Sequence, residues 1–158
     1  MYSMKESALA IQTTLQSLGF ENQVVELPDS TRTAQEAADA IGCTVAQIAK
    51  SIIFRMKNTN APLLVVASGS NRINEKLIAK VVEDKLGKAD ADFVREHTGF
   101  VIGGVAPIGH TSEIVTLIDE DLFQHDTIWA AAGHPKAVFQ LTADELVQLT
   151  DGKIVAVK

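Results

Sequence analysis

A glycine- and proline-containing loop, GGVAPIGHTS at residues 103–112, is the segment of this chain that most resembles a catalytic or ligand-binding motif. It follows the phosphate-binding pattern G-x-x-x-x-G-K-S/T except that His110 stands where the lysine belongs. A phosphate-binding loop leads into a helix, whereas the next segment, TSEIVTLID, is rich in β-branched residues and predicts a strand. Pro107 also removes one of the amides that such a cradle uses. We therefore expect either a tight structural turn or a stiffened run of amides that stabilises an oxyanion.

Two further segments hold polar residues where strands are expected to begin or end. In AQIAKSIIF, Lys50 lies where a short helix gives way to an apolar strand. A lysine there either extends its side chain outward to solvent or meets an anionic partner. In AAAGHPKAV, the residues Gly133, His134 and Pro135 interrupt two apolar segments and are expected at the rim of a pocket. An ordinary turn histidine is the alternative for His134.

Runs of apolar, β-branched residues predict the strands that would position these groups. The runs are QVVEL, SIIFRM, PLLVVAS, EIVTLID, TIWAAA, KAVFQL and KIVAV. The segment KNTNAP at residues 57–62 predicts a hairpin connection between the second and third of these runs. Apolar residues at helical spacing predict a longer helix over about residues 74–86, with Gly87 as its stop.

Capping-box pairs predict where helices begin, because each pair satisfies two backbone amides that the first turn leaves without partners. The pairs are Ser3 with Glu6, Thr33 with Glu36, Thr44 with Gln47 and Thr142 with Glu145. Glycines that adopt the left-handed conformation are expected to end three of the helices. These glycines are Gly19, Gly42 and Gly152.

The order of the predicted elements does not alternate regularly between strand and helix, which disfavours a doubly wound parallel sheet. We predict instead a single α/β (α+β) domain over residues 1–158, in which helices pack around a mixed sheet.

No apolar run approaches the ~18 residues of a membrane span, and the N-terminal segment does not resemble a signal peptide. Cys43 is the only cysteine, which excludes an internal disulfide and suits a reducing cytoplasm.

The charge of the chain is unevenly distributed. The whole chain has a net charge of −6, yet residues 50–95 hold nine basic side chains against five acidic ones, a local charge of +4. A basic face of this kind can contact a short length of phosphate backbone, and the alternative is a solvated helix face.

Aromatic residues make up only 5% of the chain, so base-stacking platforms are not expected. The four histidines lack the close spacing of a zinc site, so no metal is expected.

Taken in this order, the lysine after QIA, the G-x-x-x-P loop in GFVIGGVAPIGH and the Gly-His-Pro turn resemble the YbaK-type family of aminoacyl-tRNA editing domains. This family is related to the editing domain inserted in bacterial prolyl-tRNA synthetases. The helix in LTADELVQLT before a final strand adds to the resemblance, which runs over residues 5–157. It implies a mixed, partly closed β-sheet flanked by helices, and a free-standing hydrolase that removes a wrong amino acid from the 3′ end of a transfer RNA.

The resemblance also implies roles for particular residues. Lys50 would hold the terminal adenosine or its phosphate and favour the developing oxyanion, and the backbone from Gly103 to Pro107 would grip the aminoacyl end and orient a water molecule. The substrate's own ribose hydroxyl would assist proton transfer, and no metal or other cofactor is implied. Substrate contacts are expected from Ser51, Gly104, Val105, Ala106, Gly133 and His134.

The implied substrate is tRNA-Pro that carries a small wrong amino acid such as Ala or Cys. Ser51, where some members of the family have Asn or Thr, and His134, which some cysteine-removing members lack, favour alanine. Such pocket differences are worth only about 1–3 kcal/mol per methylene. The implied partners are the acceptor end of the tRNA and a prolyl-tRNA synthetase. Arg72, Lys76 and Lys80 are the candidates for contact with the acceptor stem.

Two other functions are compatible with the same residues. One is a non-catalytic module that binds tRNA or a synthetase, and the other is a regulator that binds a free amino acid such as proline. The hydrolase requires Lys50, the 103–107 loop and His134 to converge around one small cleft, which the structure can test.

Overall fold

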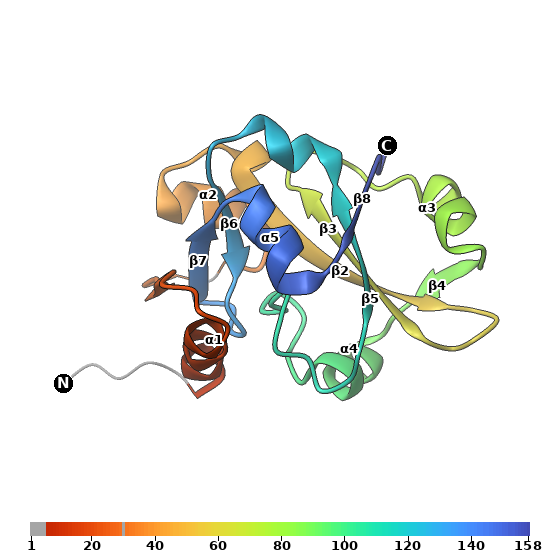
Figure 1. The fold of residues 1–158 in the computed structure, drawn as a ribbon, viewed down its shortest axis with the longest axis horizontal. Coiled ribbons are helices and arrows are strands. Elements are labelled where there is room, and N and C mark those ends of the chain that lie inside the picture. Colours follow the sequence, from red (N-terminus) through yellow and green to blue (C-terminus); the bar gives the residue numbers. More distant parts are fainter. Residues whose placement is uncertain (1–5, 30) are drawn as a thin grey trace.

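The computed structural model describes residues 6–29 and 31–158, in which helices pack on both faces of one mixed sheet (Figure 1). The helices are α1 (Glu6–Ser17), α2 (Ala34–Ile41), α3 (Glu75–Val82), α4 (Ala91–Thr98) and α5 (Ala143–Thr150), with short 3₁₀ turns η1 (Val45–Gln47) and η2 (Glu120–Gln124). The strands are β1 (Val24–Glu26), β2 (Ile48–Met56), β3 (Pro62–Ser68), β4 (Leu86–Lys88), β5 (Val115–Asp119), β6 (Ile128–Ala131), β7 (Ala137–Leu141) and β8 (Lys153–Val155). The predicted mixed sheet flanked by helices is therefore confirmed.

The strand order of the sheet is β1-β7-β6-β2-β3-β5-β8, with β4 paired to β2 outside this path. The hairpin of β2 and β3 forms its centre, in antiparallel register from the Ala49–Ser68 pair to the Arg55–Pro62 pair. Strand β3 runs parallel to β5, and β2 runs parallel to β6. Because β1 and β8 form the ends of this order, the sheet of the described residues is open, whereas the resemblance implied a partly closed one.

All seven predicted runs contain strands, and the 57–62 segment connects β2 to β3 as predicted. The sequence patterns did not reveal β4, because Leu86–Lys88 is a three-residue strand of one apolar residue, one glycine and one lysine. Its position depends on pairing with Phe54, Arg55 and Met56 of β2, which is a tertiary contact.

The predicted capping boxes form in α2 and α5. The Thr33 hydroxyl accepts a hydrogen bond from the Glu36 amide, and the Thr142 hydroxyl does the same for the Glu145 amide, each at 3.1 Å. At η1, the Thr44 amide donates to the Gln47 side chain at 3.0 Å. The pair of Ser3 with Glu6 lies outside the described residues, since the description begins at residue 6.

Two predicted helix ends are wrong. The helix predicted over 74–86 ends at Val82, where Glu83 adopts the left-handed conformation (φ 56°), and Gly87 belongs to β4. At the end of α5, Asp151 rather than Gly152 is left-handed (φ 53°). Residues other than glycine can adopt this conformation at a cost of about 1–2 kcal/mol, and the glycine pattern therefore placed both ends too late. Gly19 and Gly42 are left-handed just beyond α1 and α2, as predicted.

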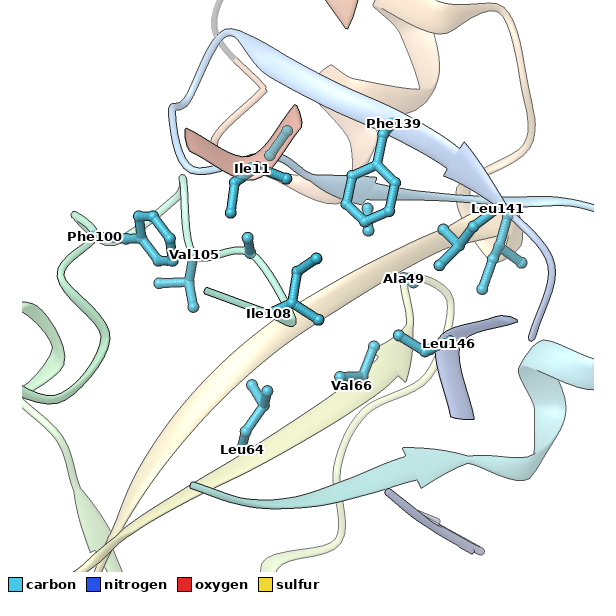
Figure 2. Packing of buried hydrophobic residues seen from close by; sticks show 14 of the residues in the cluster. Ile11, Ala49, Leu64, Val66, Phe100, Val105, Ile108, Phe139, Leu141 and Leu146 are labelled. Carbon is cyan, nitrogen blue, oxygen red and sulfur yellow. The ribbon is translucent and has the colours of Figure 1, made fainter. Parts of the chain in front are cut away.

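The two faces of the sheet bury different clusters, because side chains alternate along each strand. On one face, here called the α1/α5 face, Ala49, Leu64 and Val66 pack against Ile11 of α1 and Leu146 of α5 (Figure 2). The loop residues Phe100, Val105 and Ile108 join the same cluster. On the opposite face, here called the α2/α3 face, Leu63, Val65 and Met56 pack with Ile78 of α3, and Ile48 packs with Ala37 and Ala38 of α2.

Candidate functional site: a cavity at a gap in the sheet

A cavity of about 660 Å³ lies along β2. All seven consecutive residues 48–54 line it, together with the start of α2, part of β6, Gly103 and Val105. Successive side chains of a strand point to opposite faces, so a cavity that contacts only one face would touch alternate residues. Contact with seven consecutive residues places this cavity along the edge of β2 that faces away from β3.

That edge of β2 is paired at its two ends only. Ile48 and Ala49 pair with β6, and residues 54–56 pair with β4. On the β3 side, the Met56 amide donates to the Ala61 carbonyl at 2.9 Å, so even-numbered residues of β2 bond to β3. The amide and carbonyl groups of Ser51 therefore point into the gap between β6 and β4, where the described strands provide no partner. These two backbone groups are available to a ligand.

Lys50 lines this cavity on the α2/α3 face, since its cross-strand partner is Ala67 of the α2/α3 cluster. The side chain is half-buried, and the described residues provide no hydrogen bond or ion pair for its ammonium group. Arg32 and Lys88 also line the cavity, against one carboxylate, that of Glu75. The excess of positive charge favours an anionic ligand.

The loop of residues 103–107 forms the opposite wall. Gly103 is left-handed (φ 91°), and a Cβ atom there would lie 2.8 Å from Cγ of Arg32. A Cβ atom on Gly104 would lie 2.9 Å from backbone atoms of His134. Glycine at both positions therefore allows the loop to pack directly against two other segments. Gly103 and Val105 line the cavity, whereas Gly104, Ala106 and Pro107 are buried behind them.

His110 holds this loop from behind. Its Nε2 atom lies 2.7 Å from the Ala106 carbonyl oxygen and donates a hydrogen bond to it. Burial lowers the pKa of His110 below its ordinary value of 6.5, and the bond to the carbonyl only partly opposes this shift. The neutral imidazole with its proton on Nε2 is therefore the form that fits near neutral pH. The residue that departs from the phosphate-binding pattern thus supports the loop and does not line the cavity.

The Gly-His-Pro turn also lies behind the loop. Gly133 and His134 are not among the residues that line the cavity, although both were predicted to contact substrate. The His134 Nδ1 atom accepts a hydrogen bond from the Lys136 amide at 3.0 Å. The Pro135 carbonyl accepts two hydrogen bonds of 2.6 Å, from the amide and the hydroxyl of Thr31. The turn therefore ties the segment before α2 to the 103–107 loop.

Of the remaining predicted residues, Ser51 lies in the cavity and the three basic residues lie outside it. Ser51 lines the cavity, and its hydroxyl oxygen is buried with no hydrogen-bond partner in the described part of the chain. A buried hydroxyl without a partner is costly, so a ligand or a water molecule is expected to bond to it. Arg72, Lys76 and Lys80 are exposed and lie outside the cavity, the last two on α3.

The structure adds cavity residues that sequence reasoning missed. They are Arg32, Phe54, Lys88 and Trp129. The signal for Arg32 was its position directly before the predicted capping box of α2, but nothing in the sequence indicated that this helix would cover β2. Phe54, Lys88 and Trp129 reach the cavity through the pairing of β2 with β4 and β6.

Residues 28–149 match the family described as "Aminoacyl-tRNA editing domain". The chain belongs to the aminoacyl-tRNA editing domain family. The matched segment includes both walls of the cavity, from Arg32 before α2 to the turn at residues 133–135. The editing-domain fold predicted from the resemblance is thereby confirmed.

Known proteins with a similar sequence or structure span most of this editing domain. "Uncharacterized protein YwhH" of Bacillus subtilis is 30% identical over 94% of both chains. "Putative Cys-tRNA(Pro)/Cys-tRNA(Cys) deacylase EbsC" of Enterococcus faecalis is 24% identical over 78% of this chain and 76% of that protein. A crystal structure described as "a putative trans-editing enzyme for prolyl tRNA synthetase" superposes with a TM-score of 0.93, at 42% identity over 99% of both chains.

The described residues provide neither a membrane-spanning helix nor a cluster of metal-ligating side chains. No helix within residues 6–29 and 31–158 is long and apolar enough to cross a membrane. Over the same residues, no group of three or more His, Cys, Asp and Glu side chains is arranged to hold a metal ion.

Proposed function

We propose that this editing domain is an aminoacyl-tRNA deacylase that hydrolyses the ester of a mischarged tRNA. The observation that carries the proposal is the shared cavity: Lys50 lines one wall, and the backbone at Gly103 and Val105 lines the other. The cavity volume of about 660 Å³ falls within the range of about 300–1,000 Å³ typical of ligand pockets. Its excess of positive charge suits the 3′ end of an RNA.

The chemistry requires positioning and charge stabilisation, because an aminoacyl ester is already activated. The Lys50 ammonium group would bind the terminal phosphate or adenosine and stabilise the oxyanion of the tetrahedral intermediate. Backbone groups at Gly103 and Val105 would hold the aminoacyl group and orient the attacking water. Pro107, buried behind them, would keep the loop stiff. A ribose hydroxyl of the substrate would accept or relay the proton.

The residues behind the loop would act by supporting it. His134 contacts the loop at Gly104 and does not line the cavity, so we assign His134, with Gly133 beside it, a positioning role in place of direct substrate contact. Gly104 and Ala106 are buried with them. Ser51 is the strongest candidate for direct contact, since its buried hydroxyl lacks a partner among the described residues.

We infer that the substrate is a tRNA-Pro carrying a small wrong amino acid, alanine or cysteine. The names of the EbsC relative and of the superposed crystal structure both refer to proline-specific components, which supports this inference. The partners would be the tRNA acceptor end and a prolyl-tRNA synthetase, and the site of action the cytoplasm, where these substrates occur.

The decisive experiment is a deacylation screen that crosses several mischarged amino acids with a few tRNAs. The proposal expects hydrolysis of at least one small amino acid on tRNA-Pro, and loss of that activity in Lys50→Ala. If every mischarged tRNA survives micromolar protein and still binds it, the chain is a non-catalytic tRNA-binding module. Calorimetry with free amino acids tests the alternative of an amino-acid-responsive regulator.

The exposed cations Arg72, Lys76 and Lys80 are our candidates for the acceptor stem. Replacing Lys76 and Lys80 with Glu is expected to weaken tRNA binding and to flatten the dependence of log K on log salt, by about 0.7–0.9 for each phosphate that the protein no longer neutralises. Binding measured at several salt concentrations checks this. An unchanged salt slope would mean that this face of α3 is merely solvated.

A further inference from the structure

The cavity has two chemically different ends on the α2/α3 face of β2. At one end, Ile48 pairs with Trp129 of β6, beside Ala34 and Ala37 of α2. At the other end, Phe54 pairs with Lys88 of β4. Even-numbered residues of β2 point to the same face, so Lys50 lies between these two ends.

Phe54 and Lys88 are close neighbours. The Lys57 amide donates to the Lys85 carbonyl at 2.8 Å, which makes the Arg55–Gly87 pair a hydrogen-bonded pair. Phe54 and Lys88 therefore form the adjacent non-hydrogen-bonded pair, in which Cα atoms approach to about 4.5 Å and the side chains lie together.

The two side chains differ in freedom and in partners. Phe54 is half-buried and packs against the cluster of Leu63, Val65 and Ile78, which holds its ring in place. Lys88 is exposed, and no described acidic group lies within ion-pair distance of its ammonium. A fixed aromatic ring beside a free cation provides the two contacts that a single-stranded nucleotide requires, a surface for stacking the base and a charge for the phosphate.

We infer that Phe54 and Lys88 form the subsite for the 3′-terminal nucleotide, with the adenine stacked on Phe54 and the 5′ phosphate bound by Lys88. This inference rests on the proposed function, and it differs from the expectation that so few aromatic residues provide no stacking surface. The four residue-to-residue steps from Lys50 to Phe54 span about 13 Å between Cα atoms. That length leaves room for the ribose, so that the ester lies at Lys50, which keeps the role of stabilising the oxyanion and leaves the adenosine and its phosphate to Phe54 and Lys88.

The orientation of the aminoacyl group follows from this assignment. With the nucleotide at the β4 end, the amino acid side chain points toward Trp129, Ala34 and Ala37. That end is apolar, and half-buried Trp129 packs with Ile48 there. The RNA then leaves the cavity on the side of β4, which is connected directly to α3 and its exposed lysines.

The test measures binding of adenosine 5′-monophosphate and of adenosine by NMR titration, which requires no hydrolysis. We expect Phe54→Leu, which keeps an apolar side chain in the cluster, to weaken binding of both ligands by roughly 10-fold. Phe54→Tyr is expected to keep wild-type affinity, because it keeps the ring. Lys88→Ala is expected to lower the affinity for the nucleotide to that for adenosine, and to leave adenosine binding unchanged. Lys153→Ala, an exposed cation on β8, is the matched control.

Several outcomes would overturn the subsite. They are absence of binding by the wild type at millimolar nucleotide, equal affinities for Phe54→Leu and the wild type, and equal losses for both ligands in Lys88→Ala. Failure of the proposed function has a different signature, in which the expected binding pattern is observed but no mischarged tRNA is hydrolysed. If tRNA is hydrolysed, the same variants should raise KM for aminoacyl-tRNA and leave kcat unchanged.

Discussion

The two walls of the cavity are held in place by different kinds of contact. The β2 wall belongs to the central hairpin, in which seven consecutive residues pair with β3. The wall at residues 103–107 has no regular structure and depends on a few specific contacts, with Arg32, His134 and His110. A repeating ladder tolerates the loss of one side chain, whereas a loop held at three points shifts when one of them fails. Substitutions on the strand should therefore change chemistry alone, and substitutions around the loop should change both chemistry and stability.

The largest effect is expected on the strand wall, from Lys50→Ala. Loss of an oxyanion-directed charge costs about 2–4 kcal/mol of transition-state stabilisation, or roughly 30- to 900-fold in rate. Because this ammonium has no partner among the described residues, the free energy of unfolding should change by less than about 0.5 kcal/mol. Single-turnover deacylation and thermal unfolding of the same variant measure the two quantities. Unchanged hydrolysis would remove Lys50 from the mechanism.

The next effect is expected on the loop wall, from Gly104→Ala. The new Cβ would lie 2.9 Å from backbone atoms of His134, which cannot rotate away, so the loop must move at a cost of about 1–3 kcal/mol in stability. The same movement displaces Gly103 and Val105 and should slow deacylation. Unfolding and deacylation are measured together.

Gly42→Ala is the matched control for this substitution. Gly42 is left-handed at the end of α2, and an added Cβ there meets nothing within 4 Å, so the variant should lose about 1 kcal/mol of stability through strain alone. Its deacylation rate should be unchanged. Equal activity losses in the two glycine variants would contradict the distinction between the two walls.

The smallest effect is expected from the hydrogen bond behind the loop. Because burial lowers the pKa of His110, the native state favours its neutral form, and unfolding releases the ring to protonate near its ordinary value of 6.5. The stability contributed by neutral His110 is thus present above that pH and declines as the pH falls below it. His110→Gln keeps a donor for the Ala106 carbonyl without titrating, so it should remove this part of the pH dependence.

Comparison with His110→Leu separates the hydrogen bond from the packing of the ring. Leucine fills the site without donating, and the lost bond should cost about 0.5–1.5 kcal/mol above pH 7 and slow deacylation. Denaturant unfolding from pH 5 to pH 8 provides the curves. Parallel curves for wild type and His110→Gln would show that His110 does not titrate on unfolding.

The difference between the walls also explains how much of the site could be predicted from the sequence. The strand wall is encoded locally: the apolar run after QIA predicted a strand that begins near Lys50, and β2 follows it. For the loop wall, glycine and proline indicated a special backbone without indicating which segments it contacts. His134 was expected in the cavity for this reason, whereas it packs behind Gly104.

The gap in the sheet could not be predicted from any local pattern. It exists because β4 and β6 pair with opposite ends of the same edge of β2. Phe54, Lys88 and Trp129 belong to ordinary strands in the sequence, and only the register of these pairings brings them to one cavity. Register between distant strands is a property of the whole fold, so residues of this kind are missed by motif analysis.

The opening of the cavity can change its width while the central hairpin stays the same. The width of the opening beside β2 depends on β4, a three-residue strand between α3 and α4. The β2 wall of the cavity depends instead on the central hairpin of β2 and β3. A longer or shorter connection between α3 and β4, or between β4 and α4, would change the width of this opening and leave the β2 wall unchanged. Small insertions near β4 could therefore change which aminoacyl groups the cavity accepts during evolution, while the rest of the fold stays the same.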